Sequence, residues 1–121
     1  MRDRIAGFEL SDHNGVLVAS VEGEIDGSNA AELRLALSER LPNPSIGLVL
    51  DLSDVTYLDS SGVHLMFDLG RRLAARRQVL RLVVPQSAPI LRVLQLCAVE
   101  AVVPIDDAIG PALAALTSGA E

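Results

Sequence analysis

Apolar residues recur along this chain in two spacings, one typical of β-strands and one typical of α-helices. Mostly apolar runs of strand length occupy residues 8–11, 16–22, 46–52 and 79–84, and a shorter edge strand is expected at 101–103. Helical spacing predicts helices over residues 30–41, 60–77 and 90–97, and a last helix from residue 106 toward 116. Because strands and helices alternate from Val16 to Val103, the pattern predicts a mixed, partly parallel sheet with helices packed against it.

Turn and capping residues divide these segments. Asn14-Gly15 stands between the first two strand-like runs, and this pair is a strong signal for a β-hairpin. Asn29 and Glu32 have the spacing of a capping box, which predicts the start of the first helix. Pro111 limits the last helix, because proline has no backbone N–H to donate within a helix.

The polar corner Asp59-Ser60-Ser61-Gly62 joins an apolar strand to a helix and is the most informative stretch of the chain. Its ordinary explanation is capping, in which a side-chain oxygen accepts from free backbone N–H groups and contributes roughly 1 kcal/mol. Alternatively, Ser60 is an exposed hydroxyl that serves as a nucleophile or as a phosphate acceptor. A helix N-terminus tolerates a phosphate, whereas neighbouring Asp59 would repel it. The residues alone leave both interpretations open.

The length and composition suit one layered α/β domain. A chain of 121 residues can bury one core, expected over about residues 8–116. Aromatic residues are scarce, so this core must consist of Val, Leu, Ile and Ala. No apolar run approaches the ~18 residues needed to cross a bilayer, and the first eight residues lack the apolar region of a signal peptide. We therefore expect a cytoplasmic protein.

The charge pattern argues against nucleic acid and anionic membranes as direct partners. The net charge is −6, whereas such binding depends on clustered basic residues that neutralise phosphates. One basic cluster exists and consists of Arg71, Arg72, Arg76, Arg77 and Arg81. It is interpreted as the solvated face of a helix, because no aromatic residues for base stacking accompany it.

Enzymatic chemistry has little support in the sequence. A hydrolase would use Ser60 or Ser61 as nucleophile and His64 as base, but the Gly-x-Ser-x-Gly elbow is absent and no carboxylate is placed to orient the imidazole. In a receiver-like domain, Asp51, Asp54 or Asp59 would accept a phosphoryl group. The absence of Lys from the whole chain counts against this function. We expect no enzyme.

Metal and cofactor sites are likewise not expected. The two His residues, His13 and His64, and the single Cys, Cys97, are scattered and supply no ligand cluster. Cys97 falls in register with the apolar residues Ile90 and Leu94 of a predicted helix. It is therefore predicted to be a small buried side chain.

The run DLSDVTYLDSSGV, residues 51–63, resembles the phosphorylation loop of bacterial anti-sigma factor antagonists, which are small stand-alone STAS-domain proteins. Upstream, Gly23-Glu24-Ile25-Asp26 is similar to the family's strand ending in Gly-Glu-hydrophobe-Asp, and Val93-Leu94-Gln95-Leu96 precedes a short strand as in the family. The likeness covers nearly the whole chain. It implies a single STAS domain over residues 1–121, with a mixed sheet of four to five strands and helices packed against it.

The resemblance also implies a function in transcription regulation and the stress response. Asp26 and the corner Asp59-Ser60-Ser61-Gly62 would lie close together and dock on an anti-sigma factor serine kinase, releasing a sigma factor. Ser60 would be the phosphoacceptor, with Ser61 the alternative, and a phosphatase would be a further partner. ATP would be bound by the kinase and no cofactor by this chain. Phosphorylation adds roughly two negative charges beside Asp59 and near Asp26, which would loosen the complex.

Two departures from the family pattern and one alternative function accompany this resemblance. His64 stands where the family usually has a small residue, so it is either a contact for partner specificity or a residue tolerated on the helix surface. Cys97-Ala98-Val99 replaces a Thr-Gly-hydrophobe segment and lacks its helix-ending glycine. The alternative is a STAS module that mediates protein interaction in another regulatory assembly without being phosphorylated.

Overall fold

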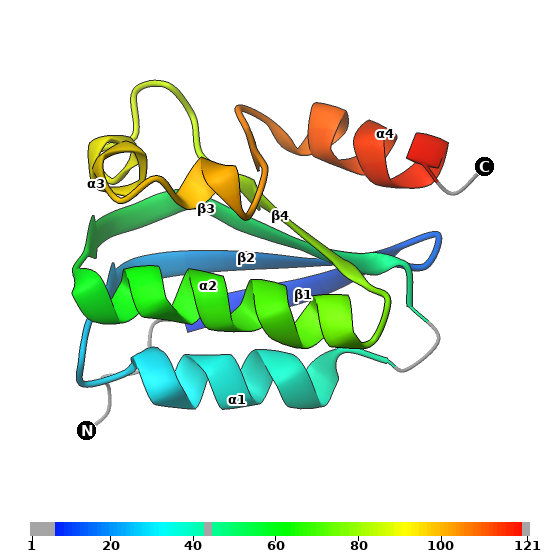
Figure 1. Ribbon diagram of the computed structural model, residues 1–121, viewed down its shortest axis with the longest axis horizontal. Helices are drawn as coiled ribbons and strands as arrows, with labels where there is room; N and C mark the ends of the chain where they lie inside the picture. Colours follow the sequence, from blue (N-terminus) through cyan, green and yellow to red (C-terminus); the bar gives the residue numbers. More distant parts are fainter. Residues whose placement is uncertain (1–6, 43–44, 120–121) are drawn as a thin grey trace.

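Five strands form one mixed sheet whose spatial order follows the sequence, β1-β2-β3-β4-β5 (Figure 1). The computed structural model describes residues 7–42 and 45–119. Strand β1 (Gly7–His13) pairs antiparallel with β2 (Val16–Ile25). The strands β3 (Gly47–Leu58), β4 (Val79–Val83) and β5 (Ile105–Asp106) then add in parallel. The prediction of a mixed, partly parallel sheet is confirmed.

The helices cover both faces of this sheet. Helices α1 (Ala30–Arg40) and α2 (Ser60–Ala75) lie side by side against one face, and α4 (Ile109–Gly119) lies over the other (Figure 1). Helix α3 (Leu91–Leu96) and the short 3₁₀ helix η1 (Val99–Ala101) connect β4 to β5. No helix among the described residues is long and apolar enough to span a membrane.

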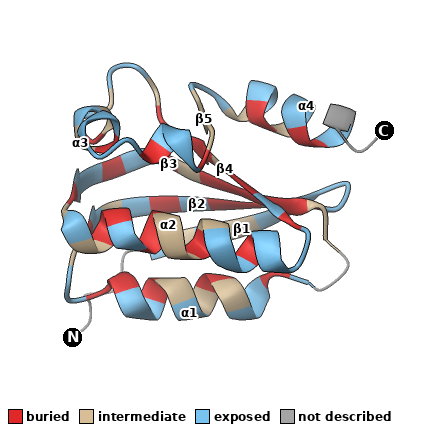
Figure 2. Ribbon diagram, viewed as in Figure 1, coloured by how far each residue is buried: buried red, intermediate tan, exposed pale blue. Residues whose placement is uncertain are grey.

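Strand β3 lies at the centre of the domain and is buried on both faces (Figure 2). Leu48 and Leu50 contribute to the larger core beneath α1 and α2, whereas Val49 between them contributes to the smaller core beneath α4. Successive side chains of a strand point to opposite faces, so a strand covered on both sides needs an unbroken apolar run. Leu33 from α1 and Met66 from α2 complete the larger core.

The predicted hairpin turn is confirmed. Asn14 and Gly15 both have positive φ angles, 56° and 91°, as the tight turns between antiparallel strands require. The side chain of Asp12 accepts a hydrogen bond from the backbone N–H of Gly15 at 3.1 Å. Local residue chemistry thus explains the turn between β1 and β2.

Strands β2 and β3 extend beyond the predicted residues. The predictions ended at residues 22 and 52, but the two strands remain paired as far as Ile25 and Leu58. The extension passes through a register shift beside Gly23, whose φ angle is 96°. Such an irregularity interrupts the alternation of apolar and polar positions. The pairing that continues the strands is therefore not visible in the pattern of either strand alone.

The edge strand predicted at residues 101–103 is wrong, and so is the predicted start of the last helix at residue 106. Residue 101 ends η1, and Val103 is buried in the larger core. The edge strand is β5. Its Asp106 forms a bidentate ion pair with Arg81 of β4, in which Nε donates to Oδ2 at 2.8 Å and Nη2 donates to Oδ1 at 3.1 Å. Helix α4 therefore begins only at Ile109.

Cys97 is exposed, so the prediction that it is buried is wrong. Helix α3 ends at Leu96, and the chain turns immediately afterwards through Ala98, which is left-handed with φ 56° and ψ 36°. This turn carries Cys97 out of the apolar stripe and brings Val99 into the core. Ala98 occupies the helix-ending position of the missing family glycine, in a conformation that costs a residue with a Cβ roughly 1–2 kcal/mol.

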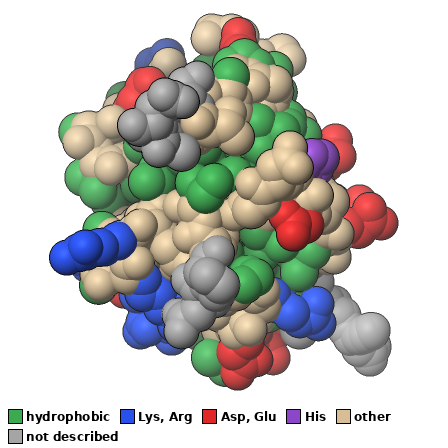
Figure 3. Space-filling model, turned by 90° about the vertical axis from the view of Figure 1, so that its right-hand side faces the viewer, with side chains coloured by type: hydrophobic (Ala, Val, Ile, Leu, Met, Phe, Trp, Pro, Cys, Tyr) green, Lys and Arg blue, Asp and Glu red, His purple; other side chains and the backbone are tan. Residues whose placement is uncertain are grey.

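The predicted basic cluster is only partly on the surface. Arg71, Arg72, Arg76 and Arg77 are exposed, as a solvated helix face requires, but Arg81 is half-buried in β4. Its hydrogen bonds to Asp106 raise the pKa of Arg81. Figure 3 views the end of the molecule where α1 and α2 finish, and most of the arginine side chains in this view, drawn in blue, lie in its middle and lower part.

Candidate functional site

Two parallel strands end side by side at one edge of the sheet. Ile25, the last residue of β2, pairs with Leu58, the last residue of β3. The backbone N–H of Asp59 then donates to the carbonyl of Ile25 at 3.3 Å. The segment starting at Asp26 and the corner starting at Asp59 therefore begin as neighbours, although they are far apart in the sequence.

Asp59 performs the capping function at the start of α2. Its carboxylate accepts from the backbone N–H groups of Ser61 at 2.8 Å and Gly62 at 3.4 Å. These donors have no partner inside the helix, so a carboxylate at this position stabilises the first turn. The capping explanation thus holds for Asp59 and leaves the hydroxyl groups of Ser60 and Ser61 for other uses.

The two serines differ in exposure. Ser60 is the first residue of α2 and is exposed, whereas Ser61 is half-buried. A Cβ atom built on Gly27 would lie 3.4 Å from the Ser61 hydroxyl, which shows that Ser61 faces the segment leading into α1. Ser60 is therefore the accessible hydroxyl of the pair.

Asp26 is held by the residues that follow it. The backbone N–H and the hydroxyl of Ser28 both donate to Asp26 Oδ1, at 2.9 and 2.6 Å. These hydrogen bonds stabilise the carboxylate and lower the pKa of Asp26. Asp26 is therefore ionised at neutral pH and adds a negative charge beside the corner.

Asn29 does not form the capping box predicted with Glu32. Its buried side chain instead accepts from the backbone N–H of Asp26 at 3.0 Å and donates to the carbonyl of Glu24 at 2.8 Å. The amide therefore connects the end of β2 to the start of α1. This connection positions Asp26, a role that the spacing of Asn29 and Glu32 could not reveal.

Ser28→Ala is expected to raise the pKa of Asp26 toward its ordinary value of 3.8, because the side-chain hydrogen bond is the largest cause of the lowered pKa. A lowered pKa in the folded state contributes stability above the ordinary pKa, and this contribution is lost as the pH falls through the folded-state value. The variant should therefore lose less stability on acidification. Carboxyl NMR titration measures the pKa, and Ser53→Ala, which removes a similar contact to Asp51, is the control. An unchanged Asp26 pKa in Ser28→Ala would contradict the assignment.

Gly62 allows α2 to begin directly against the sheet. A Cβ atom at this position would lie 2.6 Å from Cγ of Leu58 and 3.3 Å from Cγ2 of Ile25, both of which are buried. The requirement is space, because the φ angle of Gly62 is not positive. The glycine of the corner thus sets the distance between the serines and the strand ends.

A groove with a volume of about 380 Å³ runs between α1 and α2 from the corner. Its walls are formed by Gly27, Ala30, Ala31, Arg34, Ser61, His64, Leu65, Asp68 and Arg71. His64 is exposed and lines this groove. Within residues 7–42 and 45–119, no hydrogen bond joins His64 to Ser60 or Ser61, and no cluster of three His, Cys, Asp or Glu residues is suited to a metal.

The domain model that matches this chain is the STAS domain, over residues 8–112. The chain belongs to the STAS domain family. It is 44% identical over 57 residues to the anti-sigma-F factor antagonist RsfB of Mycobacterium tuberculosis, a match that spans 47% of each chain and thus about half the length of that relative. It is 28% identical over 102 residues to the anti-sigma F factor antagonist of Paenibacillus polymyxa, covering 83% of this chain and 86% of the relative.

A similar solved structure agrees with the fold expected from the sequence. The crystal structure of an anti-sigma factor antagonist from Mycobacterium paratuberculosis superposes with a TM-score of 0.81 at 29% identity, covering 92% of this chain and 93% of the other. The resemblance and the fold expected from the sequence are confirmed. The prediction that this STAS domain is not an enzyme agrees with relatives that are named as antagonists of regulatory factors.

Sequence reasoning missed one part of this STAS domain, which is the contact between α1 and α2. Arg34 of α1 lies with its Nε 3.3 Å from Oδ2 of Asp68 in α2. The spacing of Asp68 with Arg71 and Arg72 was a readable signal for ion pairs within one helix. The contribution of Arg34 had no sequence signal, because it depends on how the two helices pack.

Proposed function

We propose that this STAS domain is an anti-sigma factor antagonist that binds an anti-sigma factor serine kinase in the cytoplasm and thereby releases a sigma factor. The observation that carries the proposal is the exposed Ser60 hydroxyl at the first residue of α2, next to the ionised Asp26. The relatives named as anti-sigma factor antagonists support it. Asp26, Asp59, Ser60, Ser61, Gly62 and His64 form the proposed docking surface.

Phosphorylation of Ser60 by the bound kinase ends the interaction in this proposal. The Ser60 Oγ attacks the γ-phosphorus of the ATP held by the kinase, the bond from that phosphorus to the bridging oxygen of ADP breaks, and the hydroxyl proton is released. The product is phosphoserine on this chain and ADP on the kinase. A phosphatase that hydrolyses the phosphoserine restores the antagonist.

The corner is poorly equipped to neutralise the new charge. Asp59 already accepts from the backbone N–H groups of Ser61 and Gly62, which would otherwise be available to a phosphate at the helix N-terminus. Asp26 already accepts from both donors of Ser28. A phosphate on Ser60 therefore adds roughly two negative charges to a surface with two carboxylates, and a partner that fits the unmodified surface is repelled.

The test of the phosphoacceptor is a labelling experiment. Wild-type chain is used to capture its kinase from a lysate of the source organism, and the purified kinase is incubated with ATP and with each variant. We expect phosphopeptide mapping to place one phosphoryl group on Ser60, Ser60→Ala to remain unlabelled and Ser61→Ala to be labelled normally. A stable complex without any phosphorylation would instead favour the STAS interaction module that is not phosphorylated, and labelling of Ser61 would overturn the choice of Ser60.

A further inference from the structure

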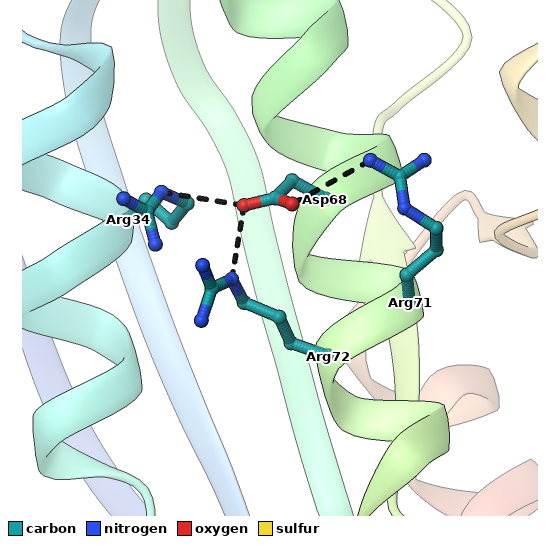
Figure 4. A network of polar contacts seen from close by, with 4 residues as sticks. All are labelled: Arg34, Asp68, Arg71 and Arg72. Atoms are coloured by element: carbon teal, nitrogen blue, oxygen red, sulfur yellow. Dashed lines mark hydrogen bonds and ion pairs between the residues drawn. The ribbon is translucent and has the colours of Figure 1, made fainter.

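Three arginines surround a single carboxylate between α1 and α2 (Figure 4). The Nε atoms of Arg34 and Arg72 lie 3.3 and 3.0 Å from Oδ2 of Asp68, and Nη2 of Arg71 lies 3.5 Å from Oδ1. One carboxylate cannot balance three guanidinium groups, so two positive charges are left over. This excess is notable in a chain with a net charge of −6.

The three arginines are not held equally. Arg34 is mostly buried, with 28% of its side chain exposed, and it reaches Asp68 from the neighbouring helix. Arg71 is 69% exposed and makes the longest contact. Exposed ion pairs of this kind contribute little to stability, because solvent competes for both partners. The Arg71 guanidinium is therefore available to a second anion without loss of the contact between the helices.

Part of the excess charge lies on the groove that starts at the corner. Arg34, Asp68 and Arg71 line the same groove as Ser61 and His64, whereas Arg72 does not, so one excess positive charge faces the groove. Near the corner, its wall on the α1 side consists of the small residues Gly27, Ala30 and Ala31, which leaves room for an entering side chain. The groove is thus continuous with the proposed docking surface and has the opposite charge from its two aspartates.

We propose that this groove binds an acidic segment, an Asp or Glu side chain, of the anti-sigma factor kinase that docks at the Ser60 corner. This inference rests on the proposed function and names a second contact of the same interface. Arg71 and Arg34 donate to the entering carboxylate, since guanidinium groups match carboxylates in charge and shape. A partner must then present basic groups to Asp26 and Asp59 and an acidic group to the groove. This arrangement of complementary charges selects the partner and its orientation.

The groove is tested without the kinase by NMR titration of the ¹⁵N-labelled chain with a hexaglutamate peptide at low salt. We expect chemical-shift changes at Gly27, Ala31 and His64 and at the Arg71 Nε–H. Arg71→Gln should weaken the interaction by about tenfold, as for the loss of one charge-assisted hydrogen-bonded pair. Asp68→Asn should strengthen it, because removal of the carboxylate increases the positive charge of the groove.

Arg76→Gln is the matched control, because Arg76 is an exposed arginine that follows α2 and does not line the groove. It should bind hexaglutamate within about twofold of the wild type. Shift changes that avoid the groove residues overturn the proposal. Equal shifts at equal concentrations of inorganic phosphate also overturn it, because the groove would then be a site for free anions.

The captured kinase supplies the second readout. Arg71→Gln should weaken its complex with the unmodified chain by about tenfold, while Arg76→Gln should not. If the complex forms and responds to Ser60→Asp but not to Arg71→Gln, the groove proposal is wrong and the proposed function stands. If no kinase binds but hexaglutamate occupies the groove, the acidic ligand preference stands and the partner assignment fails.

Discussion

Ser60→Asp is expected to weaken the complex between this chain and its anti-sigma factor kinase by about a hundredfold or more. The substitution places a carboxylate at the first residue of α2, beside Asp59 and near the ionised Asp26. Both existing carboxylates already accept hydrogen bonds from nearby N–H groups. The added charge therefore remains uncompensated and opposes a partner that is complementary to the unmodified surface.

Calorimetric titration of the purified kinase with wild type, Ser60→Asp and Ser60→Asn measures this effect. Asn has nearly the same size and shape as Asp but no charge, so the difference between these two variants isolates the electrostatic part. We expect Ser60→Asn to bind much more tightly than Ser60→Asp, and the gap to narrow at high salt as screening increases. Equal affinities of the Asp and Asn variants would falsify a charge-based switch.

Gly62→Ala is expected to lower the free energy of unfolding by about 1–3 kcal/mol. The new methyl group would lie 2.6 Å from Cγ and 3.0 Å from Cδ1 of Leu58. Leu58 is buried at the end of β3, so it has little room to move away. The start of α2 must shift instead, and Ser60 shifts with it, so the variant should also bind the kinase more weakly.

Urea unfolding followed by circular dichroism measures the stability change, and Gly110→Ala is the matched control. Gly110 lies in α4, and a Cβ atom there would meet nothing within 4 Å. The same substitution should therefore change stability by less than about 1 kcal/mol, because the helix preference of alanine opposes the crowding of its Cβ by the following Pro111. If both variants lost the same amount of stability, the close approach at Gly62 would not be a determinant of the site.

Features that depend on neighbouring residues were predictable from the sequence. The Asn14-Gly15 turn and the corner at Asp59 each result from the backbone preferences or hydrogen-bonding groups of a few consecutive residues. The alternation of strands and helices follows from the spacing of apolar residues, and it was confirmed. The presence of a serine at the start of a helix was equally visible in the chain.

Features that depend on distant segments required the structure. The extension of β2 and β3 depends on the pairing between them. The exposure of Cys97 depends on the packing of Val99 into the core, and the position of the edge strand depends on the ion pair between Arg81 and Asp106. In each case a partner from elsewhere in the chain outweighs the local pattern. Sequence patterns therefore placed these elements only approximately.

The sequence by itself determined the α/β class, the serine corner and its likeness to the STAS family, because each of these depends on the types and spacing of residues along the chain. Only the tertiary structure decided that Ser60 is exposed while Ser61 faces α1, and that Asp26 lies beside the corner. It also decided that Arg34 forms an ion pair with Asp68 and that both line the groove together with Arg71. Exposure and charge pairing are properties of surfaces brought together by packing, so no single stretch of the chain contains them.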